Sequence, residues 1–159
     1  MKRVLLFLLS LLLAFFSLSS CGEEDFFLPF RGGFVAEVQG TLGELAFAAE
    51  ICREVGSGGV ETVTVTFYAP NELAGTVLCR TAAGDTVTAE GLTVAGGAWC
   101  DALLSLLLPR EGVKKIAVTD TGHTRVDGDE YSFEFLSDGT PVAVKTDTVV
   151  ADIVRFEVK

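Results

Sequence analysis

Few residues of this sequence could do acid–base or nucleophilic chemistry. His123 is the only histidine, and it lies in the turn-like stretch Thr121-Gly122-His123-Thr124. A histidine acts as a general base when it lies beside a nucleophile and a third group orients it, and no such set can be recognised here. Motifs of serine hydrolases, zinc proteases and phosphate-binding loops are also absent from the sequence. We therefore expect no enzymatic activity and interpret His123 as a solvated turn residue.

Metal binding is the second chemistry to consider. The run Asp127-Gly128-Asp129-Glu130 places three carboxylates together, but it lacks the ligand spacing of a calcium-binding EF-hand loop, and a hairpin turn explains it. Cys52, Cys79 and Cys100 are widely spaced, and the chain has no Cys-x-x-Cys pair, which argues against zinc. We expect neither a metal nor a cofactor.

The amino terminus has the composition of a secretory signal peptide. Lys2 and Arg3 supply a positive start, and an apolar run from Val4 to Phe16 follows them. A transmembrane helix needs roughly 20 apolar residues. This shorter run, followed by small residues, therefore predicts a cleaved signal peptide over residues 1–20.

Cys21 is the residue to which its neighbours assign a chemistry. The stretch Leu18-Ser19-Ser20-Cys21 resembles the lipobox of bacterial lipoproteins, in which the cysteine receives a diacylglycerol before the chain is cut. Two acyl chains matter, because one chain binds a membrane only weakly and reversibly. We predict lipidation at Cys21; the alternative is a plain secreted protein in which Cys21 has no such role.

Lipidation would place the protein outside the cytoplasm, anchored to a cell membrane of Gram-positive type or to an outer membrane. The residue after Cys21 is Gly22 and not the aspartate that would retain a lipoprotein at an inner membrane, so both locations stay open. The full chain has a formal charge of −10, and loss of Lys2 and Arg3 makes the mature chain more negative still. This charge argues against nucleic acid and against adhesion to anionic lipid head groups. We therefore expect the membrane to be a partner only through the acyl chains.

The mature chain is predicted to consist of a lipidated tether over residues 21–33 and a single domain over residues 34–159. The tether is acidic at its start and contains Phe26 and Phe27. Two alternatives stay open for these aromatic residues: they enter the lipid interface, or they pack on the domain.

The three cysteines of the domain do not predict a disulfide. Three is an odd number for an exported chain, so at least one thiol stays unpaired. Cys52 and Cys79 fall on predicted strands with one other strand between them. That spacing puts them about 9–10 Å apart, which is too far for a disulfide. We interpret Cys52, Cys79 and Cys100 as small buried hydrophobic residues.

From Phe34 onward, apolar and polar residues alternate between turn signals, which predicts β-strands. In the clearest case, Val60-Glu-Thr-Val-Thr-Val-Thr-Phe67, threonine lies on one face and apolar residues on the other, as in an antiparallel sheet that is solvated on one side. In the last strand Val154 and Phe156 share a face and Ile153 lies on the other, which weakens the alternation. The predicted strands are 34–39, 45–55, 60–68, 73–81, 84–94, 113–119, 123–127, 130–136, 141–147 and 149–158.

The stretch from Ala98 to Pro109 is the one strong helix prediction in the mature chain. Asp101 suits the first turn of a helix, and Pro109 ends it. One broad apolar face is formed by Trp99, Leu103, Leu106 and Leu107. Two interpretations stay open: the helix closes the core of an α+β domain, or it is a lid over a cavity that the sheet lines.

Three stretches, together with the order of the predicted elements, carry a resemblance to a known family. They are Gly128-Asp-Glu-Tyr131-Ser-Phe133-x-Phe135-x-x-Asp138-Gly139-x-Pro141, Phe67-Tyr68-Ala69-Pro70-x-Glu72-Leu73-x-Gly75 and Glu90-Gly91-Leu92. Over about residues 34–158 the chain resembles the LolA-like lipoprotein carrier superfamily, in particular small lipoproteins of Gram-positive bacteria. The resemblance implies an α+β, mostly β fold, in which a strongly curved antiparallel sheet, an open half-barrel, is covered by an apolar helix.

The resemblance also implies a function. Better-known members of the superfamily ferry or receive the acylated ends of lipoproteins in a hydrophobic cavity. Soluble carriers of the family use several lid helices and often an arginine that latches the lid. This sequence predicts one helix and does not assign a latch to Arg80, Arg110 or Arg125. A chain that is itself anchored fits a receptor or a local chaperone better than a shuttle.

We therefore expect a hydrophobic cleft between sheet and helix that holds an acyl chain, a lipoprotein or a client protein. The alternative is a surface structural or interaction module with a filled core and no ligand. The residues expected to line the cleft are Phe47, Ile51, Val65, Phe67, Trp99, Leu103, Leu106, Leu107, Tyr131, Phe133 and Phe135.

Overall fold

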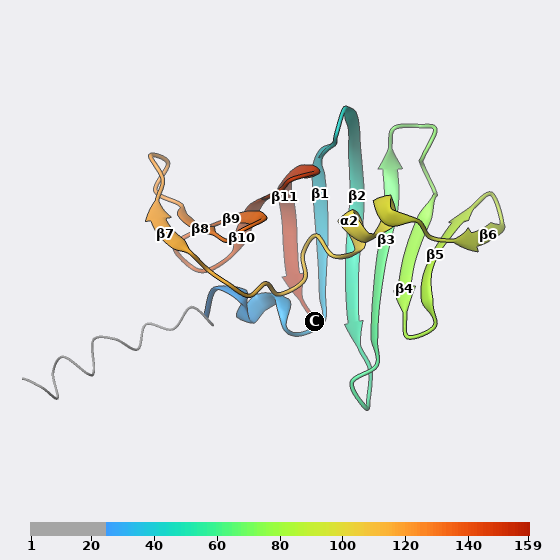
Figure 1. Ribbon diagram of the computed structural model, residues 1–159, viewed down its shortest axis with the longest axis horizontal. Helices are drawn as coiled ribbons and strands as arrows, with labels where there is room; N and C mark the ends of the chain where they lie inside the picture. Colours follow the sequence, from blue (N-terminus) through green and yellow to red (C-terminus); the bar gives the residue numbers. More distant parts are fainter. Residues whose placement is uncertain (1–24) are drawn as a thin grey trace, which may run out of the picture.

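The computed structural model describes residues 25–159 and contains one open antiparallel sheet of eleven strands with a short α-helix on one face (Figure 1). The predicted signal peptide over residues 1–20 and the lipidation site Cys21 lie outside the described residues. The predicted fold class is confirmed: the chain is mostly β, and the sheet is not closed into a barrel. The elements are η1 (Asp25–Phe30), β1 (Phe34–Leu42), β2 (Leu45–Val55), β3 (Glu61–Ala69), β4 (Val77–Thr81), β5 (Gly84–Ala89), β6 (Leu92–Ala95), α2 (Ala98–Leu104), β7 (Lys115–Val118), β8 (Thr124–Asp127), β9 (Tyr131–Phe135), β10 (Pro141–Thr146) and β11 (Val149–Val158).

The strands form two meanders that meet in the middle of the sheet. The order across the sheet is β6-β5-β4-β3-β2-β1-β11-β10-β9-β8-β7, so the first and last strands of the chain are central neighbours. Gly40 permits a close approach of β1 and β11, because a Cβ at this position would lie 2.1 Å from the carbonyl oxygen of Val150. The two edge strands, β6 and β7, follow each other in sequence, and the connection that contains α2 crosses one face of the sheet (Figure 1).

That face, called the inner face below, carries the hydrophobic core. Val63, Val65 and Phe67 of β3 are buried on it, whereas the threonines between them lie on the outer face. Leu103 and Leu104 of α2, with Leu106 and Leu107 just after it, pack onto the same core. The alternation in the sequence therefore predicted both the strands and the face that they bury.

A β-bulge explains the weak alternation of the last strand. The pairing of β1 with β11 shifts between Glu37 and Val38, and the extra residue reverses the side on which the following residues lie. Ile153 and Phe156 both pack with the core, whereas Val154 is exposed. The sequence-based placement of Val154 and Phe156 on one face, with Ile153 on the other, is therefore wrong.

Further predicted boundaries also differ from the structure. The predicted strand 73–81 begins only at Val77, and residues 73–76 lie in the loop before it. The predicted strand 84–94 is a hairpin, β5 and β6, whose two-residue turn has Glu90 at φ 49° and Gly91 at φ 81°. Positive φ at both turn residues is typical of the tight turns that join antiparallel strands. The helix is also shorter than predicted and ends at Leu104. The C-cap residue, Ser105, donates both its amide, at 2.9 Å, and its hydroxyl, at 2.5 Å, to the carbonyl of Asp101.

The predicted tether is part of the packed unit from Asp25 onward. Phe27 and Phe30 of η1 are buried in the core, and the ring of Phe27 lies edge-on to that of Phe133 at a centroid distance of 5.4 Å. Arg53 donates hydrogen bonds to the carbonyls of Phe30 and Gly32, the second at 3.1 Å. Of the two alternatives for the aromatic residues, packing on the domain is the one observed, so the folded unit begins well before residue 34.

The cysteines differ from one another in burial. Cys100 is fully buried in α2, as predicted. Cys52 and Cys79 both lie opposite Thr64, on strands separated by β3. They are only partly buried on the outer face, so their interpretation as buried hydrophobic residues is wrong. All three thiols are free.

Candidate binding groove on the inner face

Nine of the eleven predicted cleft residues form a filled core. They come from β2, β3, β9 and the α2 region, and the exposed fraction of each is at most 4%. Side chains therefore occupy the space between α2 and the centre of the sheet, and the ligand-contact role of these residues stays a prediction. The nine are Phe47, Ile51, Val65, Phe67, Leu103, Leu106, Leu107, Phe133 and Phe135.

The other two predicted cleft residues lie at the margin of this core. Trp99, in the first turn of α2, is 44% exposed. Tyr131 is half-buried; its ring packs on Gly128 and lies edge-on to Phe27 at 5.9 Å, and its hydroxyl donates to the carbonyl of Glu111 at 3.3 Å. Tyr131 also packs against Phe133, with ring centroids 5.9 Å apart, and so contacts the edge of the core.

Apolar cover is missing at the β4–β6 end of the inner face. The strand register aligns Leu78 of β4 with Val87 of β5 and Val94 of β6, so these three side chains form a row on one face. Helix α2 contacts β3, β4 and β5, and exposure rises along the row from 0% at Leu78 to 60% at Val94. Leu92, which pairs with Ala89 on the same face, is 75% exposed. The hydrophobic lining of the sheet therefore continues beyond the part that the helix covers.

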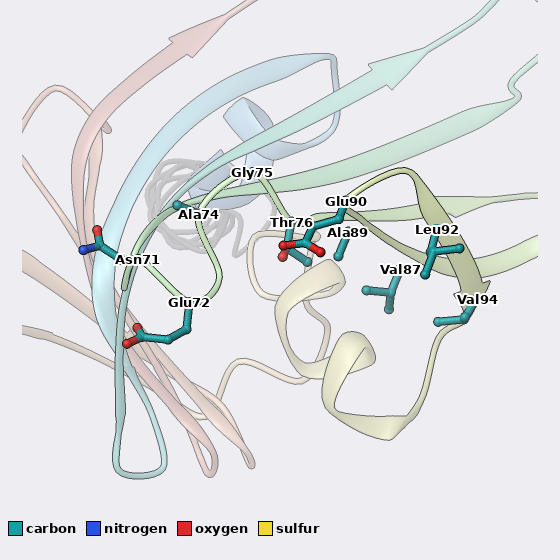
Figure 2. Close-up of a pocket in the computed structure, with 10 residues that line it drawn as sticks. All are labelled: Asn71, Glu72, Ala74, Gly75, Thr76, Val87, Ala89, Glu90, Leu92 and Val94. Atoms are coloured by element: carbon teal, nitrogen blue, oxygen red, sulfur yellow. The ribbon is translucent and has the colours of Figure 1, made fainter.

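This uncovered end forms one side of a groove of about 750 Å³, called the β6 groove below. Figure 2 shows Val87, Ala89, Leu92 and Val94 on the β5–β6 hairpin, with the loop between β3 and β4 across from them. The residues that this loop contributes to the lining are Asn71, Glu72, Ala74, Gly75 and Thr76. The groove thus has an apolar floor and a more polar wall.

Local hydrogen bonds hold the loop wall in place. Gly75 donates its amide to the carbonyl of Phe67 at 2.9 Å, and Phe67 donates to the carbonyl of Thr76 at 3.0 Å. Gly75 has φ 80°, a backbone conformation that residues other than glycine rarely adopt. Leu73 packs against the core, and Thr76 is buried. These contacts make the wall a fixed part of the domain.

Two carboxylates belong to the lining of the groove. They are those of Glu72 and Glu90, and no lysine, arginine or histidine lines it. Both glutamates are exposed, and within residues 25–159 neither forms a salt bridge. An apolar floor beside unpaired carboxylates suits a ligand that is both hydrophobic and cationic.

Arg80 holds α2 at the inner border of this groove. Its guanidinium forms a bidentate salt bridge with Asp85 of β5, at 2.9 and 2.7 Å, and donates a third hydrogen bond to Asp101 of α2 at 2.6 Å. The hydrogen bond from Arg80 lowers the pKa of Asp85. Of the three arginines considered as a latch, Arg80 joins α2 to the sheet, whereas Arg110 binds the carbonyl of Ser105 and Arg125 pairs with Asp127.

Few other described residues could take part in acid–base chemistry or bind a metal. His123 lies in a turn, and its Nδ1 is 3.6 Å from a carboxylate oxygen of Glu134. Across residues 25–159 no three histidine, cysteine or acidic side chains lie close enough together to hold a metal ion. In the same part of the chain, no helix has the length and apolar character needed to span a bilayer. The expectation of no enzymatic activity stays a prediction.

Sequence reasoning missed the β6 groove because it joined β5 and β6 into one strand. The signal that could have separated them is Glu90-Gly91, a turn dipeptide within an otherwise β-like run. With that turn placed, Leu92 and Val94 fall on a four-residue strand at the sheet edge. The main contacts of α2 are with β3, β4 and β5, so the apolar side chains of that strand lie beyond the helix.

Solved structures of other proteins share this fold. An uncharacterized conserved protein from Thermus thermophilus superposes with a TM-score of 0.53 at 14% identity, over 82% of this chain and 81% of that one. MucB superposes with a TM-score of 0.53 at 14% identity, over 88% of this chain and 60% of MucB. This chain therefore spans less than two thirds of the length of MucB.

A third structure, a domain from Vibrio parahaemolyticus assigned to outer membrane lipoprotein sorting, superposes with a TM-score of 0.46 at 7% identity, over 80% of this chain and 86% of that domain. No protein-family model matches the chain, and no curated protein sequence does. A structural match at 14% identity shows a shared fold alone, and a match with a TM-score of 0.46 is too weak to support a relation. The comparisons therefore relate the chain to the first two proteins by fold, and membership of the LolA-like superfamily stays a prediction.

Proposed function

We propose that this protein is a lipid-anchored, extracytoplasmic binding protein of LolA-like type that holds the hydrophobic part of a client in the β6 groove. The observation that carries the proposal is the row Leu78, Val87, Val94, in which the apolar inner face passes from fully buried to mostly exposed. Exposed apolar surface of this kind, beside a concave wall, is typical of a binding site.

The lipobox-like stretch that ends at Cys21 supports the anchored part of the proposal. Because side chains fill the space under α2, the binding position differs from the one expected from the sequence. An acyl chain or client segment has no room between α2 and the middle strands, but it has room over β5 and β6. The site is therefore a groove at one end of the inner face and not a central cavity.

A second candidate function is a surface interaction module that binds no ligand. The packing of nine predicted cleft residues at 4% exposure or less favours it. The two functions differ in what the β6 groove does, because a module without a ligand leaves Leu92 and Val94 without a role.

Binding assays on the unlipidated mature chain test the proposal. A fluorescent fatty acid and a fluorescent hydrophobic peptide are titrated against the wild type and against the double variant Leu92→Ser, Val94→Ser. We expect at least one probe to bind the wild type and the double variant to weaken that binding at least tenfold, since two apolar contacts of about 1–1.5 kcal/mol each are lost.

The matched control is Val150→Ser, Val154→Ser, which makes the same kind of change at two exposed valines away from the groove. The control should bind as the wild type does. Equal binding by the groove variant and the wild type, or no binding of either probe, would contradict the proposal and favour the interaction module.

A further inference from the structure

The β6 groove ends at an open sheet edge. β6 pairs with β5 on one side only and is the last strand in the sheet. Its four residues, Leu92-Thr93-Val94-Ala95, are all exposed and include no charge and no proline. Natural proteins usually protect such edges with lysine, proline or a bulge. The opposite edge strand, β7, does begin with a lysine, Lys115.

The backbone of β6 presents unpaired groups in a defined pattern. Gly96, directly after the strand, donates its amide to the carbonyl of Asp85 at 2.8 Å. Because residues in an antiparallel ladder face the neighbouring strand alternately, Val94 and Leu92 also direct their amides and carbonyls toward β5. The amides and carbonyls of Thr93 and Ala95 therefore point away from the sheet, where an incoming strand would meet them.

The side chains follow the complementary pattern. Leu92 and Val94 lie on the inner face and line the groove, while Thr93 pairs across the hairpin with Thr88. A strand added beside β6 would lie about 4.8 Å away, and alternate side chains would point to the inner face. Those side chains would extend the row formed by Leu78, Val87 and Val94.

Charge narrows the kind of strand that fits. Glu72 and Glu90 are the only ionisable residues in the lining of the groove, and a lysine or arginine of the partner would relieve their unpaired charge. A second copy of this chain fits poorly, because each copy has a formal charge of −10 and would bring its own Glu90 to the interface.

The geometry points to strand addition: the β6 edge binds an extended segment of another protein, apolar at alternate positions and carrying lysine or arginine. This inference rests on the proposed function and adds to it the binding mode and the class of partner. Main-chain hydrogen bonds to Thr93 and Ala95 would supply affinity, and the β6 groove would select the alternate side chains.

A backbone variant separates strand addition from groove binding. Ala95→Pro removes an outward amide and leaves Leu92 and Val94 in place, and proline is tolerated on an edge strand where the amide faces solvent. The matched control is Val118→Pro on β7. Thr119 donates its amide to the carbonyl of His123, so the amide of Val118, one residue earlier, faces outward as well.

The probe is a fluorescein-labelled peptide with a lysine at each end and valine alternating with threonine between them. We expect Ala95→Pro to weaken its binding at least tenfold and Val118→Pro to leave binding unchanged. The same peptide methylated at every internal backbone nitrogen should bind the wild type at least tenfold more weakly, a result that does not depend on how a protein variant folds. Glutamate in place of the two lysines should also weaken binding.

Other outcomes would overturn the inference. If Leu92→Ser, Val94→Ser abolishes binding while Ala95→Pro and peptide methylation have no effect, strand addition is wrong and groove binding stands. If none of these changes affects binding, both the inference and the proposed function fail. A wild-type dimer that Ala95→Pro converts to a monomer in sedimentation would replace the partner protein with a second copy of this chain.

Discussion

At the scale of single residues, Arg80 links the helix to the groove. It bridges Asp85 on β5 and Asp101 on α2. The side chains of Arg80 and Asp85 are each 25% exposed. This partial burial makes their bidentate salt bridge stronger than an ordinary surface ion pair. The contact to Asp101, which is largely exposed, adds less to stability but joins α2 to the sheet.

Removing this link should change stability in a pH-dependent way. Arg80 lowers the pKa of Asp85 in the folded state. The Arg80–Asp85 contact therefore contributes fully to the free energy of unfolding above the unfolded-state pKa of Asp, about 3.9. This contribution is lost as the pH falls through the lower folded-state pKa. We expect Arg80→Met to reduce the free energy of unfolding by about 1 kcal/mol at pH 7. The difference from the wild type should shrink at pH 2.5, as measured by urea denaturation at both pH values.

Arg155 provides the control for this experiment. Its ion pairs with Glu37 and Glu157 are well exposed, and such pairs contribute little to stability. Arg155→Met should therefore unfold almost as the wild type does at either pH. A difference between wild type and Arg80→Met that stays the same from pH 7 to pH 2.5 would contradict the role assigned to the Arg80–Asp85 contact.

At the scale of elements, the alternation of the sequence predicted most strands closely. The pattern around Val63 and Val65 requires a sheet with one buried face, and that face is the observed one. Features that depend on one residue escaped prediction: the bulge near Val154 reverses the alternation, and the turn at Glu90-Gly91 divides a strand. The filled core was equally hidden, because an apolar row such as Phe133 and Phe135 looks the same whether it contacts other side chains or a ligand.

The η1 segment is the element whose role changed most between sequence and structure. Phe30 is 0% exposed, whereas Leu28, two residues earlier, is 63% exposed. We expect Phe30→Ala to reduce the free energy of unfolding by about 3–5 kcal/mol and Leu28→Ala by less than about 0.5 kcal/mol. Thermal and urea denaturation measure both, and equally small effects would mean that residues 25–30 are a tether and not part of the core.

At the scale of the whole molecule, packing of η1 shortens the expected tether. If Cys21 carries the lipid, three residues lie between it and the start of η1 at Asp25, and the four steps from Cys21 to Asp25 span at most about 14 Å when fully extended. The η1 end of the domain would then lie close to the membrane. β6 is five strands from β1, or about 24 Å along the sheet, and Figure 1 shows η1 and β6 well apart along the longest axis. The β6 groove would remain open to proteins in the surrounding water.

The anchor itself has a direct test. In cells fed a radiolabelled fatty acid, the wild type should carry label and sediment with membranes, and Cys21→Ser should lose the label and leave the membrane fraction. Cys52→Ser is the control, because Cys52 lies on a strand of the folded domain and should not affect lipidation. Label retained by Cys21→Ser would show that the lipid is attached elsewhere.

Whether a hydrophobic client binds in the β6 groove can be seen residue by residue. Nuclear magnetic resonance of isotope-labelled residues 22–159, titrated with the lysine-flanked valine–threonine peptide, reports each amide and methyl group separately. We expect the largest shifts at the amides of Thr93 and Ala95 and at the methyl groups of Leu92 and Val94. Shifts confined to the outer face, or at methyl groups of the central core such as Leu103 and Val65, would show that the client does not bind in the β6 groove.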